Sequence, residues 1–357
     1  MTLSSSSTRM KRVVIGMSGG VDSSVSALLL KEQGYQVTAL FMKNWEEQDA
    51  TGVCRSAQDY EDVVKVCEAL DIPYYAVNFV KEYREHVFSH FLSELRLGHT
   101  PNPDILCNRE IKFKVFLEKA LELGADYLAT GHYSQIEGQK LLKGKDLGKD
   151  QSYFLYTLNR TILQKVLFPI GHLEKTEVRR IAKERGLATF EKKDSTGICF
   201  IGKRDFKSFV GGYLGYTPGD FETLCGKKLG RHDGIAFYTI GQRKGMGIGG
   251  KGEAWFVVGK DPLRNVVFVE QGEHHPALYK DHLFATELSW VSLSPPSLPY
   301  ACSAKVRYRQ SDQPCIIESI VEGRALVRFP TPQRAITPRQ SIVFYDQDIC
   351  LGGGIIL

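Results

Sequence analysis

A glycine- and serine-rich segment, residues 18–24 with the sequence SGGVDSS, carries residue types that bind anions. It directly follows the apolar run Val13–Met17, which predicts a strand ending in a loop. Gly19 and Gly20 would let the backbone approach a ligand and turn N–H groups toward it. The serine hydroxyls can donate to phosphate oxygens, and Asp22 could hold a magnesium ion. The segment therefore predicts a phosphate site.

A helix is expected behind this loop, over Ser24–Lys31. The N–H groups of its first turn and the positive end of its dipole would strengthen the anion site. The sequence has neither the lysine of a Walker A motif nor a GxGxxG fingerprint here, so both of those motifs are excluded. The loop resembles instead the pyrophosphatase loop of enzymes that cleave ATP between its α and β phosphates.

Cys107 lies in a context that favours a reactive thiol. The preceding Asn102-Pro103-Asp104 is a good helix opening, which would place Asp104 and Cys107 one turn apart on the same face. If the helix begins later, with Asn108 as its cap, Cys107 still lies beside the positive end. In both cases the local field favours the thiolate.

Cys199 lies in the polar segment Asp194–Phe200, where a thiol is accessible and able to move. Two reactive thiols and an ATP-activating loop favour sulfur chemistry over amide synthesis, because AMP is a good leaving group for a thiolate or persulfide to displace. The eight cysteines include no CxxC pair, which argues against a zinc ribbon and a secreted disulfide framework. Core packing is expected for Cys67, Cys302, Cys315 and Cys350.

The first half of the chain alternates between strand-like and helical patterns, which predicts an α/β fold with a doubly wound parallel sheet. Strands are expected over residues 12–17, 36–42, 74–79 and 126–130. Helices are expected over residues 24–33, 59–70, 82–97 and 110–123. Ligands then bind at the carboxyl ends of the strands, where residues 18–23, 42–44 and 131–132 fall.

Three domains are expected: an ATP-binding catalytic domain over residues 1–205, a small, mainly β domain over 206–280 and a C-terminal β-barrel over 281–357. Short alternating runs broken by Gly and Pro favour β structure from about Phe206 onward. Leu141–Asp150 is rich in Lys and Gly and predicts an exposed loop, with a helical stretch following to about Arg185.

The composition of the 357 residues is that of an ordinary globular protein, 43% hydrophobic and 24% charged. A formal charge of +5 is too mild to establish nucleic-acid binding by itself. No apolar segment is long enough to span a bilayer, so no membrane partner is expected. Scattered cysteines indicate a reducing compartment, the cytoplasm. Residues 1–11 are expected to form a disordered tail, with a remnant of an organellar transit peptide as the alternative.

Several long segments, in the same order, resemble the bacterial tRNA-specific 2-thiouridylases of the MnmA type, which make 2-thiouridine at the tRNA wobble position. The resemblance rests on residues 16–24, 100–113 (TPNPDILCNREIKF), 129–133 (ATGHY), 149–155 (KDQSYFL), 194–202 (DSTGICFIG), 238–250 (YTIGQRKGMGIGG) and 305–310 (KVRYRQ). It implies a PP-loop ATP pyrophosphatase with an adenine nucleotide alpha-hydrolase-like domain. It also implies ATP and Mg²⁺ as cofactors and tRNAs for Lys, Glu and Gln as substrates.

The resemblance further implies roles for single residues. Cys107 would be the nucleophile, Cys199 would carry the persulfide sulfur, and Asp104 would orient the base or act as general acid or base. The nucleotide-binding residues would be Gly16, Met17, Ser18, Gly19, Gly20, Val21, Asp22, Ser23, Met42 and Gly131. The tRNA contacts would be Asn102, Pro103, Asp104, His132, Lys149, Asp150, Gln151, Arg307, Tyr308 and Gln340.

Three of the implied tRNA contacts also have local interpretations. His132 follows a strand, where a histidine often only satisfies local hydrogen bonds. Alternation in Tyr300–Arg309 puts Arg307 on a polar face with Lys305 and Arg309, and Tyr308 opposite, which makes Arg307 the safer RNA contact. Arg339 stands where a glycine is common in the family, so the turn before Gln340 is expected to differ from that of the relatives and to re-aim Gln340.

The expected reaction begins when the C2 oxygen of the uridine attacks the α-phosphate of ATP and releases pyrophosphate. Sulfur loaded on Cys199 by a protein persulfide donor, a cysteine desulfurase or relay protein, then displaces AMP, either directly or after Cys107 frees it as hydrosulfide. A Cys107–Cys199 disulfide would close the cycle.

Three alternatives remain open. Within the same reaction, Cys107, Cys199 and Asp104 could hold an iron–sulfur cluster. The chain could instead be an amide- or guanidine-forming synthetase that uses ammonia or an amino acid. It could also be a non-catalytic tRNA-binding adaptor with a regulatory nucleotide loop.

Overall fold

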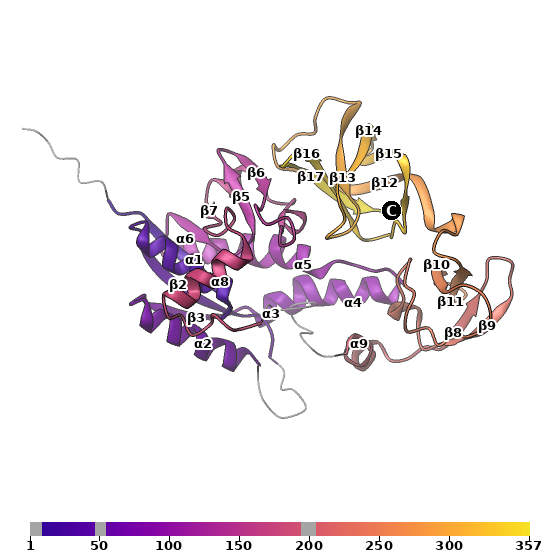
Figure 1. Ribbon diagram of the computed structural model, residues 1–357, viewed down its shortest axis with the longest axis horizontal. Helices are drawn as coiled ribbons and strands as arrows, with labels where there is room; N and C mark the ends of the chain where they lie inside the picture. The colour runs from indigo at the N-terminus through magenta and orange to yellow at the C-terminus, as the bar shows by residue number, and fades with distance from the viewer. Residues whose placement is uncertain (1–8, 47–54, 194–204) are drawn as a thin grey trace, which may run out of the picture. The chain divides into compact units, whose positions relative to one another are not determined.

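The computed structural model describes residues 9–46, 55–193 and 205–357 (Figure 1). The chain divides into two compact units. Unit 1 comprises Met1–Arg84 and Cys107–Thr196, and unit 2 comprises Glu85–Leu106 and Gly197–Leu357. No helix within the described ranges is both long and apolar enough to cross a bilayer.

A parallel five-stranded sheet with the order β3-β2-β1-β4-β7 forms the centre of unit 1 (Figure 1). Its strands are β1 (Arg12–Met17), β2 (Gln36–Lys43), β3 (Tyr74–Asn78), β4 (Tyr127–Ala129) and β7 (Val166–Leu167). The four strands expected from the sequence are confirmed to within one residue at each end. Strand β7 lies where a helical stretch was expected, and its two residues are too few to show a period.

The helices of unit 1 follow the strands in the alternating order that the sequence predicts. They are α1 (Val21–Glu32), α2 (Arg55–Ala69), α3 (Val80–Tyr83), the π-helical segment η2 (Cys107–Val115), α6 (Phe116–Glu122), the short 3-10 turn η3 (Ser152–Phe154), α7 (Arg160–Leu163) and α8 (Lys175–Glu184). A second π-helical segment, η1 (Arg84–Phe88), lies where the chain passes from unit 1 to unit 2.

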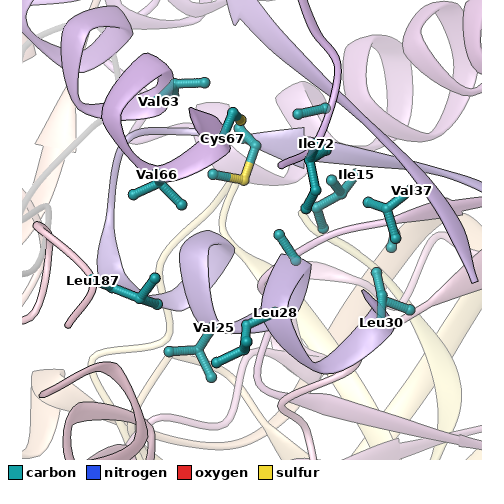
Figure 2. Packing of buried hydrophobic residues seen from close by; sticks show 14 of the residues in the cluster. Ile15, Val25, Leu28, Leu30, Val37, Val63, Val66, Cys67, Ile72 and Leu187 are labelled. Atoms are coloured by element: carbon teal, nitrogen blue, oxygen red, sulfur yellow. The ribbon is translucent and has the colours of Figure 1, made fainter. Parts of the chain in front are cut away.

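Helices cover both faces of this sheet. On one face, Val13 and Ile15 of β1 pack with residues from α1, α2 and α8 in a single apolar cluster. Figure 2 shows Cys67 inside this cluster, where burial raises the pKa of its thiol to about 11. On the other face, a Cβ placed on Gly16 would lie 3.0 Å from Cε1 of Phe116 in α6. The doubly wound fold is therefore confirmed, and Gly16 is needed because α6 packs closely on the strand.

The expected exposed loop Leu141–Asp150 is partly wrong. Strand β6 (Lys140–Lys143) pairs with β5 (Ser134–Glu137) in an antiparallel hairpin, and Leu141 is fully buried. Lys143 and Asp150 are also buried. The lysine-rich composition hid the alternating pattern of this strand. A single buried leucine sets which face of the hairpin turns inward, and one residue is too little to recognise in the sequence.

Unit 2 contains an antiparallel barrel of six strands (Figure 1). They are β12 (Tyr279–Trp290), β13 (Tyr300–Lys305), β14 (Gln313–Val321), β15 (Arg324–Arg334), β16 (Ser341–Asp346) and β17 (Ile349–Ile356). Strand β12 pairs with both β15 and β17, which closes the barrel. The expected C-terminal barrel is therefore confirmed.

The cysteines of the barrel mostly follow their structural interpretation. Cys315 and Cys350 are buried, as expected. Cys302 is only half-buried, and its Sγ lies 3.7 Å from Sγ of Cys315 on the neighbouring strand.

The central part of unit 2 is a four-stranded sheet with the order β10-β11-β8-β9. Its strands are β8 (Gly219–Glu222), β9 (Lys228–His232), β10 (Trp255–Asp261) and β11 (Val266–Gln271). The short 3-10 turns are η4 (Ile235–Phe237) and η5 (Pro276–Leu278). This part of the chain is mainly β, as the sequence predicts.

Three helices complete unit 2: α4 (Ser89–Arg96), α5 (Pro103–Leu106) and α9 (Phe206–Leu214). Helix α9 lies where β structure was expected to begin. Its aromatic residues recur at helical spacing and pack beside α4, since the rings of Phe206 and Phe91 lie 6.5 Å apart and those of Phe209 and Phe88 lie 6.2 Å apart.

Candidate active site

The loop between β1 and α1 lies at the carboxyl end of the parallel sheet. Helix α1 begins at Val21, three residues earlier than expected, and Gly20 is its N-cap in an extended conformation. Because glycine has no side chain to cap the helix, the N–H groups of the first turn are available to a bound anion. The side chains of Met17 and Val21 belong to the apolar core, so only their backbone can contact a nucleotide.

Serine side chains fix the shape of this loop. Ser23 Oγ accepts a hydrogen bond from Ser18 N at 3.2 Å and lies 3.3 Å from Ser18 Oγ. Ser24 Oγ donates to Gly20 O at 2.9 Å and accepts from Thr189 Oγ1 at 2.9 Å. These hydrogen bonds hold the loop from both ends.

Two glycines let the backbone come close to this loop. Gly19 has φ +72°, and a Cβ there would lie 2.4 Å from the carbonyl oxygen of Asp59 in α2. A Cβ on Gly131, which follows β4, would lie 2.9 Å from the backbone of Asp22 and Ser23. The structure therefore brings Gly131 to the loop between β1 and α1, where the sequence places it.

Asp22 has partners that the sequence analysis missed. Its carboxylate accepts hydrogen bonds from Lys175 Nζ at 2.7 and 2.8 Å and from the Tyr133 hydroxyl at 2.6 Å. The Lys175 ammonium also lies 5.6 Å from the centre of the Tyr133 ring. Lys175 opens α8 and is buried, so it places a positive charge beside the loop. Its only sequence signal is a lysine at a helix start, among many other charges.

Magnesium binding at Asp22 would require a change in this arrangement. The Asp22 carboxylate, the candidate ligand, already binds the Lys175 ammonium, which a metal would have to displace. Within the described ranges, no group of three His, Cys, Asp or Glu side chains is placed to hold a metal ion.

Met42, the expected neighbour of adenine, is half-buried at the carboxyl end of β2.

Cys107 is the first residue of η2 and is 2% exposed. The helical stretch opens at Pro103, the earlier of the two expected starts, and Asn108 lies inside it, donating from Nδ2 to Phe154 O at 3.0 Å. Cys107 therefore lies one turn inside the helical stretch, away from the strongest part of the dipole field. Cys199, the expected persulfide carrier, lies outside the described residues.

His132 is buried and engaged within unit 1. Its Nδ1 lies 2.7 Å from Thr130 Oγ1 and its Nε2 lies 3.4 Å from Lys112 Nζ. Burial, and then the charge of Lys112, lower the pKa of His132 well below its usual value. A neutral ring that donates from Nδ1 and accepts at Nε2 fits both contacts. This geometry supports the local interpretation of His132.

The segment Lys149-Asp150-Gln151 is organised by contacts within the protein. Asp150 accepts from Gly144 N at 3.0 Å and from both the backbone and the hydroxyl of Ser152, each at 3.0 Å. Gln151 accepts from Tyr133 N at 2.9 Å through its side chain. Lys149 is half-buried. Asp150 and Gln151 thus hold the loop after the hairpin.

In unit 2 the expected alternation over Tyr300–Arg309 is wrong, because β13 ends at Lys305 and residues 306–309 form a turn. Lys305 is buried, with its ammonium 5.3 Å from the Tyr345 ring centre. Arg307 Nη2 lies 2.7 Å from Ile240 O and 3.0 Å from Ala335 O. Arg307 therefore braces the barrel against the central sheet.

The remaining predicted contacts of unit 2 lie near the start of α5, in the turn after β13 and before β16. Asn102 and Asp104 are half-buried and Pro103 is buried, and Tyr308 is half-buried under the Arg309 guanidinium at 5.5 Å from its ring centre. Gln340 donates from Nε2 to Thr100 O at 2.6 Å. Arg339 keeps φ +68°, so the turn before Gln340 has the backbone that glycine favours.

The fold and the glycine-serine loop define a nucleotide-binding α/β protein with two appended β regions. Residues 11–203 match the family described as tRNA methyl transferase HUP domain, 207–271 its PRC-barrel domain and 280–356 the aminomethyltransferase beta-barrel domain. The tRNA-specific 2-thiouridylase MnmA of Protochlamydia amoebophila is 66% identical over 97% of this chain and 93% of its own. That of Geobacillus thermodenitrificans is 58% identical over 97% and 94%. The chain belongs to the family of MnmA-type tRNA-specific 2-thiouridylases.

Among solved structures, a U34-tRNA thiolase from Methanococcus maripaludis aligns over 57% of this chain and 64% of its own, with 22% identity and a TM-score of 0.37. A likeness this distant does not bear on the activity.

Proposed function

We propose that this protein is an ATP-dependent tRNA-uridine 2-sulfurtransferase that thiolates the wobble uridine of tRNAs for Lys, Glu and Gln in the cytoplasm. The observation that carries the proposal is the preformed loop over Ser18–Ser23, closed by Gly131, in a chain that is 66% identical to a named 2-thiouridylase. The central region, 206–280, and the barrel are proposed to bind the tRNA.

The first step activates the base. The C2 oxygen of the uridine attacks the α-phosphate of ATP, the bond to the β-phosphate breaks, and pyrophosphate leaves. The first-turn N–H groups of α1 and the Ser18 and Ser23 hydroxyls are suited to hold the phosphate oxygens. Lys175, now paired with Asp22, can turn its ammonium toward the same charge, since both lie beside the loop. Met42 would border the adenine. Magnesium would enter with ATP, and no step depends on it here.

The second step replaces oxygen by sulfur. A donor protein loads Cys199 with a persulfide, whose terminal sulfur attacks C2, directly or after Cys107 frees it as hydrosulfide, and AMP departs with the original oxygen. On the direct path the Cys107 thiolate then attacks Cys199 Sγ and breaks the S–S bond that joins Cys199 to the new C2 sulfur; on the other path the same attack releases hydrosulfide beforehand. In both cases the two thiols end as a disulfide, which an external thiol reduces. Asp104 would orient the base or transfer a proton. Because Cys107 is 2% exposed, tRNA binding must uncover it.

Reconstitution tests this function. The protein, ATP, a persulfide source and unmodified tRNA are incubated, and the nucleosides are analysed by mass spectrometry, with 2-thiouridine as the expected product. Cys199→Ser should abolish 2-thiouridine but retain tRNA-dependent pyrophosphate release. Cys225→Ser is the matched control, because this exposed thiol lies in a turn of the central region. Thiolation by C199S would rule out the persulfide role.

The same experiment separates the alternatives. A synthetase that uses ammonia or an amino acid would tolerate loss of both cysteines, and a tRNA-binding adaptor would release no pyrophosphate. An iron–sulfur mechanism would give iron and labile sulfide in anaerobically purified protein, both lost in Cys107→Ser.

A further inference from the structure

The segment 97–102 connects α4 to α5 and leads directly into Asn102-Pro103-Asp104, the residues proposed to face the target uridine. Several parts of unit 2 hold this segment and the end of α4. The contacts come from the turn before β16 and from the central region, which includes β10, and all of them lie within unit 2.

The strongest of these contacts is a bidentate ion pair. Glu94 of α4 is 8% exposed, and its two carboxylate oxygens accept from Arg339 Nε at 2.7 Å and from Arg339 Nη2 at 3.0 Å. His99 Nδ1 lies 2.8 Å from the same carboxylate. Paired, charge-assisted hydrogen bonds fix direction as well as distance. The end of α4 and the turn that follows it are therefore tied to the barrel.

Neighbouring contacts hold the next residues of the segment. Gln340 donates to Thr100 O at 2.6 Å, and Lys260 Nζ donates to Gly98 O at 2.7 Å. Thr100 Oγ1 also lies 3.4 Å from Thr239 Oγ1. Gln340 thus holds the segment itself, while its neighbour Arg339 holds the end of α4 that precedes it.

Arg339 makes its contact from an unusual backbone conformation. Its φ of +68° lies in the left-handed region, which glycine adopts more easily than arginine. Backbone hydrogen bonds hold the turn, because Arg339 N donates to Ile356 O at 2.8 Å and Ile356 N donates to Gln340 O at 2.8 Å. The backbone of the barrel therefore fixes the direction in which the Arg339 guanidinium points.

The charge state of Glu94 supports the pairing. Burial acts to raise the pKa of this carboxyl, but hydrogen bonds from Arg339 and His99 outweigh it, so the pKa is lowered from its usual value. Glu94 therefore stays ionised at neutral pH.

We propose that Arg339 and Glu94 are positioning residues through which the C-terminal barrel sets the placement of Asn102-Pro103-Asp104 for the reaction. Gln340 assists by holding Thr100. In this view Arg339 contributes to the rate by fixing the end of α4, which leads into this segment, and not through contact with RNA. The inference rests on the proposed function, because it assumes that Asn102-Pro103-Asp104 meets the uridine.

The test compares Arg339→Gly, Arg339→Lys and Arg328→Gln. Glycine removes the guanidinium while suiting φ +68°, so the turn is preserved. Lysine keeps a positive charge beside Glu94 but cannot form the bidentate pair. Arg328 is the matched control: it also lies on the barrel and pairs with a glutamate, Glu318 at 2.6 Å, but on the exposed surface. R339G and R328Q remove the same charge, so their long-range effects on RNA are matched.

Two measurements are made on each variant: tRNA affinity, and the single-turnover rate of pyrophosphate release at saturating tRNA. R339G should lower the rate about tenfold or more while the affinity changes by less than about threefold, since a misplaced reacting group costs rate. R339K should fall between R339G and the unaltered protein, and R328Q should keep the full rate. An R339G rate equal to that of R328Q, or a loss in affinity alone, would overturn the proposal.

Hydrogen exchange of residues 97–106 provides a readout that does not need activity. R339G should exchange faster there than the unaltered protein, and R328Q should not. If the unaltered protein released no pyrophosphate with tRNA, the proposed function would fail, while unchanged exchange in R339G would refute the positioning role alone.

Discussion

The positively charged Lys175 lies beside the loop over Ser18–Ser23 and is paired with Asp22 of that loop. Lys175 is buried and its ammonium touches both carboxylate oxygens of Asp22, so the two charges balance each other before a nucleotide binds. The phosphates of ATP would bring further negative charge to the same place. We expect short-range attraction to draw the ammonium toward them.

Replacing Lys175 by Met should therefore impair the first chemical step. We expect pyrophosphate release to slow by about 10- to 100-fold, the effect of losing a hydrogen bond to a charged group. Lys183→Met, on the exposed side of the same helix, is the control. Steady-state pyrophosphate assays measure both, and equal rates for the two variants would count against a role for Lys175.

His132 makes the stability of unit 1 depend on pH. Its pKa is lowered in the folded state by burial and then by Lys112, so below about pH 6.5 the unfolded chain binds a proton that the folded protein does not. Stability should consequently fall as the pH drops below that value, by at most about 1.4 kcal/mol per pH unit. Urea unfolding at pH 7.5 and 5.5 should show a smaller loss for His132→Asn than for the unaltered protein. Equal losses would contradict this account.

At the scale of single residues, burial of apolar side chains was easier to predict than polar contacts. Cys67 lies on an apolar helical stripe, and its place in the core follows from spacing alone. The partners of Asp22 are 111 and 153 residues away in sequence. No local pattern reveals such pairs, which explains why Lys175 was missed.

Among the elements, the tight approach of α2 to the phosphate loop explains why Gly19 cannot carry a side chain. Gly19→Ala should distort the loop, because its Cβ would lie 2.4 Å from Asp59 O. Gly34→Ala is the control: Gly34 also has a positive φ, +82°, but a Cβ there meets nothing within 4 Å. Both variants should lose about 1 kcal/mol of stability from backbone strain. Only G19A should lose ATP binding, measured by calorimetry; binding by G19A as tight as by G34A would refute the account.

The elements that the sequence predicted well are those with a long or strong period. Strand β1, its loop and α1 follow directly from an apolar run, a glycine pair and a helical pattern. The two-residue strand β7 and the hairpin strand β6 have too few apolar residues to show a period. Helix α9 was hidden by the glycines and aromatic residues that resemble the β texture around it. Tertiary packing, here against α4, decides such cases.

For the whole molecule, Arg307 shows that a residue expected to bind RNA also joins two parts of one unit. Arg307→Ala should lower the stability of unit 2 by about 1–3 kcal/mol, because two backbone carbonyls lose their donor. Arg309→Ala, which removes a neighbouring exposed charge, should not. Thermal unfolding measures this difference, and R307A as stable as R309A would disprove the brace.

A direct RNA contact has a separate signature. Loss of one phosphate contact should reduce the slope of log affinity against log salt by about 1. Measuring that slope for R307A and R309A distinguishes an arginine that supports the fold from one that neutralises a phosphate.

The chain leaves unit 1 after Arg84 and returns to it at Cys107, and this order has a consequence for biosynthesis. Helix α4 belongs to unit 2, yet it leaves the ribosome long before α9 and the barrel, so its buried residues Phe91 and Glu94 must wait for their partners Phe206 and Arg339. During that interval its apolar face is exposed on a nascent polypeptide, which makes it a binding target for chaperones. Truncation after unit 1 would leave this helix permanently without a partner, so neither unit can be obtained by a single cut of the gene.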